Sequence, residues 1–301
     1  MNNFGRIGQA FHASSLFRKQ MLTMSIISYF KESFRRKKAR RVTQEYPPQI
    51  STFQLENEGP IEFANWTNPL VGQIVIDQGM VDFYKKYIKT GDLVIDIGAN
   101  IGDTTLPMSL AAGITGTTLG FDPNPLVFKI LELNATLNKG KVNIIPLPYA
   151  ISVNEEEFYY VSEEASFGNG AISPVKESKR WKYVYPGKIK GINLKSFLER
   201  EYPTQLDKLT FIKIDTEGYD KEIIKSIPDV IEKYKPVMVA ESYGKSSNEE
   251  KTELFNCISR FGYELYYMED FDVNAKTIRI NSSQELINWK KTINILALPI
   301  K

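Results

Sequence analysis

The sequence predicts an α/β fold, in which a mostly parallel sheet is covered by helices on both faces. From Gly91 onwards, short apolar segments typical of buried strands alternate with longer segments whose apolar residues recur at helical spacing. A glycine-containing turn joins the first of these strands to the first of these helices. The 301 residues are 42% hydrophobic and 12% aromatic, which is typical of one substantial globular domain.

Residues 1–45 are predicted to form a basic N-terminal arm. They contain ten Lys or Arg residues and two Glu residues, whereas the rest of the chain has 28 basic and 34 acidic residues. The apolar stretch of residues 21–30 is too short to span a bilayer. One interpretation is a flexible or loosely docked tail. The other is an interfacial helix, with basic residues 35–41 at anionic headgroups and four apolar side chains on lipid: Leu22, Ile26, Ile27 and Phe30.

Histidine and cysteine are nearly absent from the sequence. The one histidine, His12, lies in the arm, so the globular part holds neither a Ser-His-Asp triad nor a His-ligated metal site. The one cysteine, Cys257, excludes an intrachain disulfide and fits a reducing, cytoplasmic compartment, with peripheral attachment to a membrane left open. Because the globular part is net acidic, we expect no nucleic-acid partner.

Two regions follow the arm. Residues 46–90 are expected to form a preamble with a linker, short strands and a helix that stops at Gly91. Residues 91–301 are expected to form the main domain. Its predicted strands are residues 93–96, 117–122, 142–152, 155–164, 209–215, 235–242, 263–269 and 292–299. Its predicted helices are residues 103–112, 124–138, 191–200, 219–227 and 248–262, and residues 163–190 are expected to form an exposed flap.

The turn VIDIGANIG, between the first strand and the first helix, is predicted to bind a small molecule. It lies at the carboxyl end of a central strand, where open parallel sheets bind their ligands. Gly98 can adopt backbone angles closed to other residues, and Gly102 lets the chain approach a ligand without interference from a Cβ atom. The start of the following helix offers free N–H groups to a carboxylate or a phosphate.

Asp122 is expected in the same site, because it ends the second strand, where an acid can accept both hydroxyls of a ribose. The alternative is that Asp122 only caps the helix that begins near Asn124. A dinucleotide-binding turn has the pattern G-x-G-x-x-G, whereas this chain has D-x-G-x-x-x-G. Asp96 would repel a pyrophosphate but hold an ammonium group, and Thr104 or Thr105 would meet a carboxylate. The turn therefore favours S-adenosylmethionine over NAD.

Four stretches of the chain resemble the FkbM family of S-adenosylmethionine-dependent methyltransferases: VIDIGANIGDTT, GFDPNP, LPYAIS and FIKIDTEGYDKEII. The similarity runs in order and spacing from about Asp77 to Leu298. It implies a Rossmann-like class I methyltransferase fold, with a mostly parallel seven-stranded sheet whose last strand is antiparallel and with helices on both faces. It also implies methyl transfer mostly to hydroxyl oxygens of sugars or secondary metabolites.

The resemblance assigns the cofactor to residues at the ends of the first three strands. It places the cofactor loop at the glycine turn, the ribose acid at Asp122 and the adenine at the end of the third strand. The predicted cofactor-binding residues are Asp96, Gly98, Asn100, Gly102, Thr104, Thr105, Asp122, Asn124, Tyr149, Ala150 and Ile151.

The end of the strand FIKID carries the predicted catalytic residues. Alternation places Lys213 and Asp215 on one face, where they can form an ion pair, and Glu217 follows at the rim. Methyl transfer requires an aligned acceptor and removal of its proton. Because the core has no histidine, Asp215 or Glu217 is the predicted base, and Lys213 is predicted to hold the carboxylate or an oxyanion. The alternative is that both acids only cap the next helix.

Glu241 is a weaker candidate for the same rim. Three carboxylates can bind Mg²⁺, but Lys213 would compete with a metal, so no required metal is predicted. In the flap, Trp181, Tyr183 and Tyr185 can either stack on a sugar ring or form a packing wall.

The sequence thus predicts an S-adenosylmethionine-dependent O-methyltransferase that acts on a hydroxyl-bearing small molecule or glycan. Three alternatives remain: a nucleic-acid methyltransferase or binder that uses the arm, a nicotinamide-dependent oxidoreductase, and a degenerate fold used as a binding module. The acidic globular part disfavours the first and the altered glycine pattern the second. The intact Asp96, Gly98 and Asp122 disfavour the third.

Overall fold

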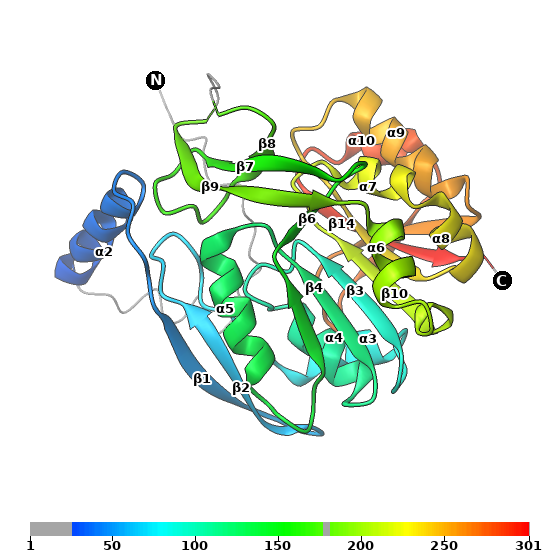
Figure 1. The fold of residues 1–301 in the computed structure, drawn as a ribbon, viewed down its shortest axis with the longest axis horizontal. Coiled ribbons are helices and arrows are strands. Elements are labelled where there is room, and N and C mark those ends of the chain that lie inside the picture. The colour runs from blue at the N-terminus through cyan, green and yellow to red at the C-terminus, as the bar shows by residue number, and fades with distance from the viewer. Residues whose placement is uncertain (1–25, 177–180, 301) are drawn as a thin grey trace.

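The computed structural model describes residues 26–176 and 181–300, which form three β-sheets surrounded by helices (Figure 1). The largest sheet has eight strands in the order β13-β12-β14-β11-β10-β3-β4-β5. The bounds of its strands are β3 (Leu93–Ile97), β4 (Thr117–Phe121), β5 (Ile144–Leu147), β10 (Leu209–Ile214), β11 (Val237–Ser242), β12 (Tyr263–Met268), β13 (Thr277–Ile280) and β14 (Ile293–Pro299).

The strand directions confirm the predicted class I methyltransferase fold. Strand β3 lies parallel to β4 and β10, and the parallel pairing continues from β4 to β5 and from β10 to β11. The last strand, β14, inserts between β11 and β12 and is antiparallel to both. The expected number of seven strands was one too few, because β13 adds an antiparallel edge strand beside β12.

Helices cover both faces of this sheet because successive side chains of each strand point to opposite faces. Val94 packs with α3 and α4 on one face, whereas Leu93 and Ile95 pack with α6, α7 and α9 on the other. The bounds of the helices are α2 (Ile26–Ala39), α3 (Gln78–Lys85), α4 (Thr105–Ala112), α5 (Pro125–Thr136), α6 (Leu194–Glu201), α7 (Asp220–Ser226), α8 (Pro228–Tyr234), α9 (Asn248–Ser259) and α10 (Ser283–Asn288), with a 3₁₀ turn η1 at Leu206–Lys208.

The preamble forms a hairpin, β1 (Pro48–Leu55) and β2 (Gly59–Trp66), followed by helix α3. Asp77 caps α3, since its carboxylate accepts a hydrogen bond from the N–H of Met80. The hairpin is fixed to α5 by Asn134, whose side chain exchanges two hydrogen bonds with the backbone of Ala64, at 2.7 and 3.1 Å. The preamble is thus a docked part of the domain.

The region expected to form an exposed flap, residues 163–190, contains strands, and a few of its described residues are buried. Within this region, β8 (Ala171–Ser173) and β9 (Tyr183–Ile192) join β6 (Tyr149–Ile151) and β7 (Glu156–Ser162) in a four-stranded sheet, ordered β6-β9-β7-β8. Ala165, Ser166 and Phe167 are fully or almost fully buried. The reason is apolar packing, because Phe167 joins a small core of buried residues from β6, β7 and β9.

Helix α2 projects from the body of the molecule in Figure 1 and is attached to it near its C-terminal end. Ala39, its last residue, is fully buried. Leu22 lies outside the described residues, as do the side chains of Ile26 and Ile27, so the lipid contacts expected of these three stay predictions. Within the part of the chain that the structure describes, no helix combines the length and apolar character needed to cross a bilayer.

Candidate active site

The polar residues singled out in the sequence meet at one edge of the large sheet. Strands β3, β4, β10 and β11 are parallel neighbours, so their carboxyl ends lie side by side. The glycine loop follows β3, Asp122 follows β4, Asp215 follows β10, and Glu241 lies near the end of β11. We call the ends of β3 and β4 the loop half of the site, and the ends of β10 and β11 the carboxylate half.

The glycine loop is built around two positive backbone angles. Gly98 has φ 78° and Gly102 has φ 96°, as their predicted role requires. A Cβ atom on Gly98 would lie 1.9 Å from the carbonyl oxygen of Asp215, and one on Gly102 would lie 3.1 Å from Leu131. Gly102 thus lies close to a side chain of α5, and its expected close approach to a ligand stays a prediction. Both glycines let neighbouring elements pack against the loop.

Asp96 lies beneath the loop, fully buried. Its Oδ2 accepts hydrogen bonds from the hydroxyls of Thr104 and Thr105, at 2.8 and 2.7 Å, and its Oδ1 lies 3.2 Å from the ammonium group of Lys213. Both carboxylate oxygens of Asp96 thus have internal partners, and the two threonine hydroxyls donate to Asp96. The expected contacts of these three residues with the ammonium and carboxylate groups of a ligand stay predictions.

Lys213 joins the two halves of the site. It is buried, and its Nζ lies 3.4 Å from Asp215 as well as 3.2 Å from Asp96, which confirms the predicted ion pair. Burial alone lowers the pKa of Lys213, but the carboxylates of Asp96, Asp215 and Asp103 outweigh burial and raise it above its usual range. Lys213 therefore remains a fixed positive charge at the centre of the sheet edge.

Asp122 is held by backbone groups on both sides of the site. Its two oxygens accept hydrogen bonds from the N–H groups of Asn100 and Asn124, each at 2.8 Å. Burial raises its pKa to about 7, although these two hydrogen bonds act in the opposite direction. Asp122 therefore holds the N–H of Asn124, but the residue that caps α5 is Asn124 itself and not Asp122, which was the alternative considered. A carboxylate has about four acceptor positions, so ribose binding by Asp122 stays a compatible prediction.

Asn124 connects the loop half of the site to the four-stranded sheet. Its side-chain oxygen caps α5 by accepting from the N–H of Leu126, and its Nδ2 donates to the carbonyl of Phe167 at 2.8 Å and to the hydroxyl of Tyr160 at 3.1 Å. Phe167 is itself held at φ 52°, a left-handed conformation. The loop of residues 163–168 is thereby fixed over the end of β4.

The residues predicted near an adenine lie on β6, which belongs to the small sheet and pairs with β9. Ala150 and Ile151 are buried in hydrophobic cores, and Tyr149 is partly exposed and meets Phe197 edge-on at 6.1 Å. Only Tyr149 therefore offers a side-chain surface there. Tyr185, one of the aromatic residues weighed as a stacking platform, meets Phe167 edge-on, which favours the packing interpretation for it.

The carboxylate half is less completely paired. The side chain of Asp215 is 38% exposed, and Glu217 has φ 54°, which turns the chain sharply at the rim. Burial and the charge of Asp215 raise the pKa of Glu217. Burial and the same neighbour raise the pKa of Glu241 to about 9, and its Oε2 is buried without a hydrogen-bond partner among the described residues. Carboxylates crowded in this way hold protons more strongly than free ones.

Asp220 was not predicted as part of the site. It is buried and binds both strand ends: its Oδ2 accepts from the hydroxyl of Thr216 at 2.7 Å and its Oδ1 from the N–H of Glu241 at 2.8 Å. Burial raises its pKa to about 7. Its signal in the sequence is its position three residues after Glu217, at the start of a helix, where acidic residues are common for reasons unrelated to catalysis.

Tyr84 and Tyr160 were missed as well. The hydroxyl of Tyr84 is fully buried without a hydrogen-bond partner among the described residues, and burial together with Asp96 raises its pKa well above the usual value. Burial and Asp122 likewise raise the pKa of Tyr160. No motif in the sequence marks either residue, because Tyr84 reaches the site from α3 and Tyr160 from β7 of the four-stranded sheet.

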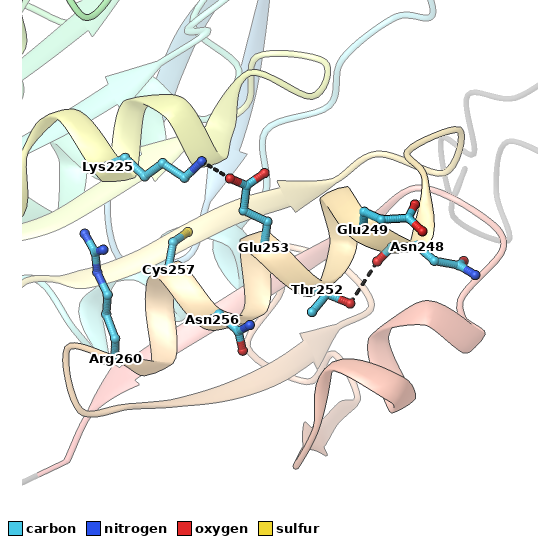
Figure 2. Close-up of a pocket in the computed structure, with 8 residues that line it drawn as sticks. All are labelled: Lys225, Asn248, Glu249, Thr252, Glu253, Asn256, Cys257 and Arg260. Carbon is cyan, nitrogen blue, oxygen red and sulfur yellow. Dashed lines mark hydrogen bonds and ion pairs between the residues drawn. The ribbon is translucent and has the colours of Figure 1, made fainter.

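One small cavity is lined by Asp220 and Glu241 of the carboxylate half, whereas a larger groove lies away from the site. An open groove of about 500 Å³ runs along α9, and Figure 2 shows the side chains that line it, including the ion pair of Lys225 with Glu253. No predicted site residue lines that groove. In residues 26–176 and 181–300, no group of three or more His, Cys, Asp or Glu side chains is arranged to hold a metal ion.

Comparison with known proteins adds to this geometry. Residues 96–270 match the family model described as the methyltransferase FkbM domain, which covers more than half of the chain. The chain belongs to the FkbM methyltransferase family. The matched segment starts at Asp96 of the glycine loop and contains both halves of the site, whereas α2, the preamble and β14 lie outside it.

The FkbM-family chain is also similar to individual proteins. The hexuronic acid methyltransferase AglP of Haloferax volcanii is 26% identical over 165 residues, which are 54% of this chain and 61% of that protein. A solved methyltransferase FkbM from Methylobacillus flagellatus has 14% identity and a TM-score of 0.41, over 72% of this chain and 50% of the other. A tRNA m1G37 methyltransferase of M. jannaschii has 13% identity and a TM-score of 0.39, over 86% and 56%. The chain thus matches less than two thirds of each relative.

Proposed function

We propose that this protein is an S-adenosylmethionine-dependent O-methyltransferase that methylates a hydroxyl of a sugar, a glycan or a related metabolite. The observation that carries the proposal is the direct link between the glycine loop and the acid of the next strand. The N–H of Asn100 donates to Asp122 at 2.8 Å, so the turn and the acid enclose one corner of the sheet edge. Membership of the FkbM family supports the reaction type.

The loop half has the groups that an adenosyl methyl donor requires. Asp122 retains acceptor positions for ribose hydroxyls beside its two backbone contacts. Two buried polar atoms beside Gly168, which follows the Phe167 carbonyl bound by Asn124, lack partners among the described residues: the Nδ2 of Asn68 and the Oγ of Ser166, 3.1 and 3.7 Å from the position of a Cβ on Gly168. Buried polar atoms without partners are costly, so hydrogen bonds to a bound ligand would stabilise them.

The carboxylate half is suited to the acceptor. When bound, S-adenosylmethionine supplies an electrophilic methyl group, and the acceptor hydroxyl must then lose its proton. Lys213 keeps the neighbouring Asp215 oriented toward the rim, 3.4 Å away. Glu217 lies next to it with a raised pKa, which makes it a stronger proton acceptor than an ordinary Glu carboxylate. In this proposal Glu217 takes the proton and Asp215 orients the hydroxyl.

A sugar acceptor is supported by the relative that acts, by its name, on hexuronic acid. A hexuronic acid has hydroxyl and carboxylate oxygens, so the product distinguishes the two: a methyl ether resists mild base, whereas a methyl ester is hydrolysed. We infer a peripheral membrane surface rather than a nucleic acid as the partner of the basic arm, because the rest of the chain is net acidic.

The test is mass spectrometry of a glycan extract incubated with the full chain and isotopically labelled S-adenosylmethionine. The proposal expects label in a base-stable ether of a glycan, formed at a rate at least about 100-fold lower by the Glu217→Gln variant. Label in a nucleic acid, or tight binding of NAD in place of S-adenosylmethionine, would contradict it.

A further inference from the structure

Helix α2 presents aromatic side chains to solvent on the side that faces away from the protein. Tyr29, Phe30 and Phe34 are 66, 67 and 70% exposed. Phe30 and Phe34 are four residues apart and therefore lie one above the other on one side of the helix. Ala39, nine residues after Phe30, lies on the opposite side and is fully buried against the body. The exposed aromatic side is thus a free surface of a docked helix.

The same helix is strongly basic. Residues 26–42 contain seven Lys or Arg residues and a single acid, Glu32. Arg36, Lys37 and Lys38 form the last turn of the helix and are exposed. An apolar side bordered by basic residues is typical of helices that lie in the interface of an anionic membrane, where aromatic rings enter the acyl boundary and cations meet headgroups. A nucleic acid would match the charge but leave Phe30 and Phe34 in water.

The chain after α2 is attached to the loop that lies over the loop half of the site. The N–H of Ala165 donates to the carbonyl of Arg40 at 3.2 Å, and the Nε of Arg40 lies 3.5 Å from Glu164. Two residues later, Phe167 accepts the hydrogen bond from Asn124, whose N–H is bound to Asp122. A short series of contacts therefore connects the basic helix to the predicted cofactor site.

We propose that α2 binds an anionic lipid surface through Phe30 and Phe34, and that the acceptor is a glycan carried on a lipid. The attachment of Arg40 to residues 164–165 holds the site beside that surface. The part that concerns the acceptor rests on the proposed methyl transfer, whereas the binding of α2 to lipid does not.

The experiment is flotation of the full chain with vesicles of phosphatidylcholine, with and without phosphatidylglycerol. We expect the wild type to float with the anionic vesicles and not with the neutral ones. The double variant Phe30→Ser/Phe34→Ser should bind the anionic vesicles at least about tenfold more weakly, because two aromatic rings no longer enter the interface. The matched control is Val75→Ser/Ile114→Ser, which removes apolar residues that are 53 and 50% exposed elsewhere; it should float like the wild type.

Three results would contradict the binding of α2 to lipid. The first is equal vesicle binding by the wild type and Phe30→Ser/Phe34→Ser, and the second is equal binding to neutral and anionic vesicles. The third is release from the vesicles by an RNA that binds the wild type and the double variant equally well. Calorimetric titration with S-adenosylmethionine separates this inference from the proposed function. The double variant should bind the cofactor like the wild type, since it touches no site residue. If neither the wild type nor the double variant binds the cofactor, the proposed function is wrong, whereas the vesicle experiment still tests lipid binding independently. If labelled product forms equally well on water-soluble and lipid-linked glycans, the lipid-borne acceptor is wrong.

Discussion

The two halves of the candidate site differ in how completely their polar groups are paired. In the loop half, Asp96 and Asp122 each accept two hydrogen bonds from neighbouring residues of the same half. In the carboxylate half, Asp215 is partly exposed, Glu217 has a raised pKa, and an oxygen of Glu241 has no partner among the described residues. Paired polar networks are rigid, whereas crowded carboxylates are held in place at a cost in stability.

From this difference we propose that the two halves have separate roles. A rigid loop presents fixed backbone groups to a cofactor without reorganisation, which is the requirement for positioning a methyl group. A carboxylate with a raised pKa, such as Glu217, holds a transferred proton more strongly than an ordinary one, which favours general base catalysis. Substitutions in the loop half should therefore act on binding and folding, and substitutions in the carboxylate half on turnover.

The largest effect is expected for Gly98→Ala. The added Cβ would lie 1.9 Å from the carbonyl oxygen of Asp215, at a residue with φ 78°, so the variant should lose cofactor binding and at least about 4 kcal/mol of stability. Gly140→Ala is the control, because φ is 87° there but no atom lies within 4 Å of the new Cβ. It should cost about 1–3 kcal/mol. Urea denaturation measures both, and equal losses would contradict the packing role of Gly98.

Lys213→Met tests the connection between the halves. Removing the buried ammonium group leaves Asp96 buried beside no cation, and we expect a loss of about 3–5 kcal/mol in the free energy of unfolding. The comparison is Arg279→Met, which breaks an ion pair of an exposed side chain with Glu264 and should cost at most about 1 kcal/mol. Similar losses for both variants would show that Lys213 is not a central contact.

Glu217→Gln should separate binding from catalysis. We expect cofactor affinity close to the wild type in calorimetry and a decrease of at least about 100-fold in kcat with the true acceptor. Asp229→Asn, a change at an exposed carboxylate on α8, should leave both quantities unchanged. Full activity of Glu217→Gln would transfer the role of base to Asp215, and full activity of both Asp215→Asn and Glu217→Gln would end the proposed mechanism.

The smallest effect concerns pH. Burial raises the pKa of Glu241 to about 9, so between about pH 5 and 9 the folded protein holds a proton that the unfolded chain releases. Its contribution to stability is present below the ordinary pKa of a Glu and is lost as pH rises toward 9. Glu241→Gln removes this titration. From pH 5 to pH 9 the unfolding equilibrium constant of the wild type should therefore rise more than tenfold relative to that of the variant. Parallel pH profiles of the two proteins would contradict the burial of this carboxyl.

Patterns along single segments predicted the fold of the large sheet and placed Gly98, Asp122 and Asp215 at the carboxyl ends of its parallel strands. The alternation of apolar residues predicted the parallel strands. Gly98 and Asp122 directly follow two neighbouring strands, and Lys213 and Asp215 lie two residues apart at the end of a third, so both pairs could be predicted from the chain. The partners of Asp96 could not be predicted in this way. They come from a helix and from a strand 117 residues further along, and only packing brings Thr105 and Lys213 to the same carboxylate.

The four-stranded sheet was the largest feature that the sequence did not predict, for a related reason. Gly, Ser and Pro in residues 163–190 indicated an exposed flap, but the burial of Phe167 depends on residues of β7 and β9 that pack around it. The edge strand β13 was missed as well, because only four residues pair with β12 and three of them are exposed. Short pairings of this kind have no strong local pattern.

The central claim is that the glycine loop and Asp122 enclose an adenosyl methyl donor. Calorimetric titration of S-adenosylmethionine into the wild type and Asp122→Asn tests it most directly, with Glu217→Gln as the comparison from the carboxylate half. The account predicts binding to the wild type, at least about tenfold weaker binding to Asp122→Asn and nearly unchanged binding to Glu217→Gln. Equal binding by the wild type and Asp122→Asn, or binding of NAD but not of S-adenosylmethionine, would contradict it.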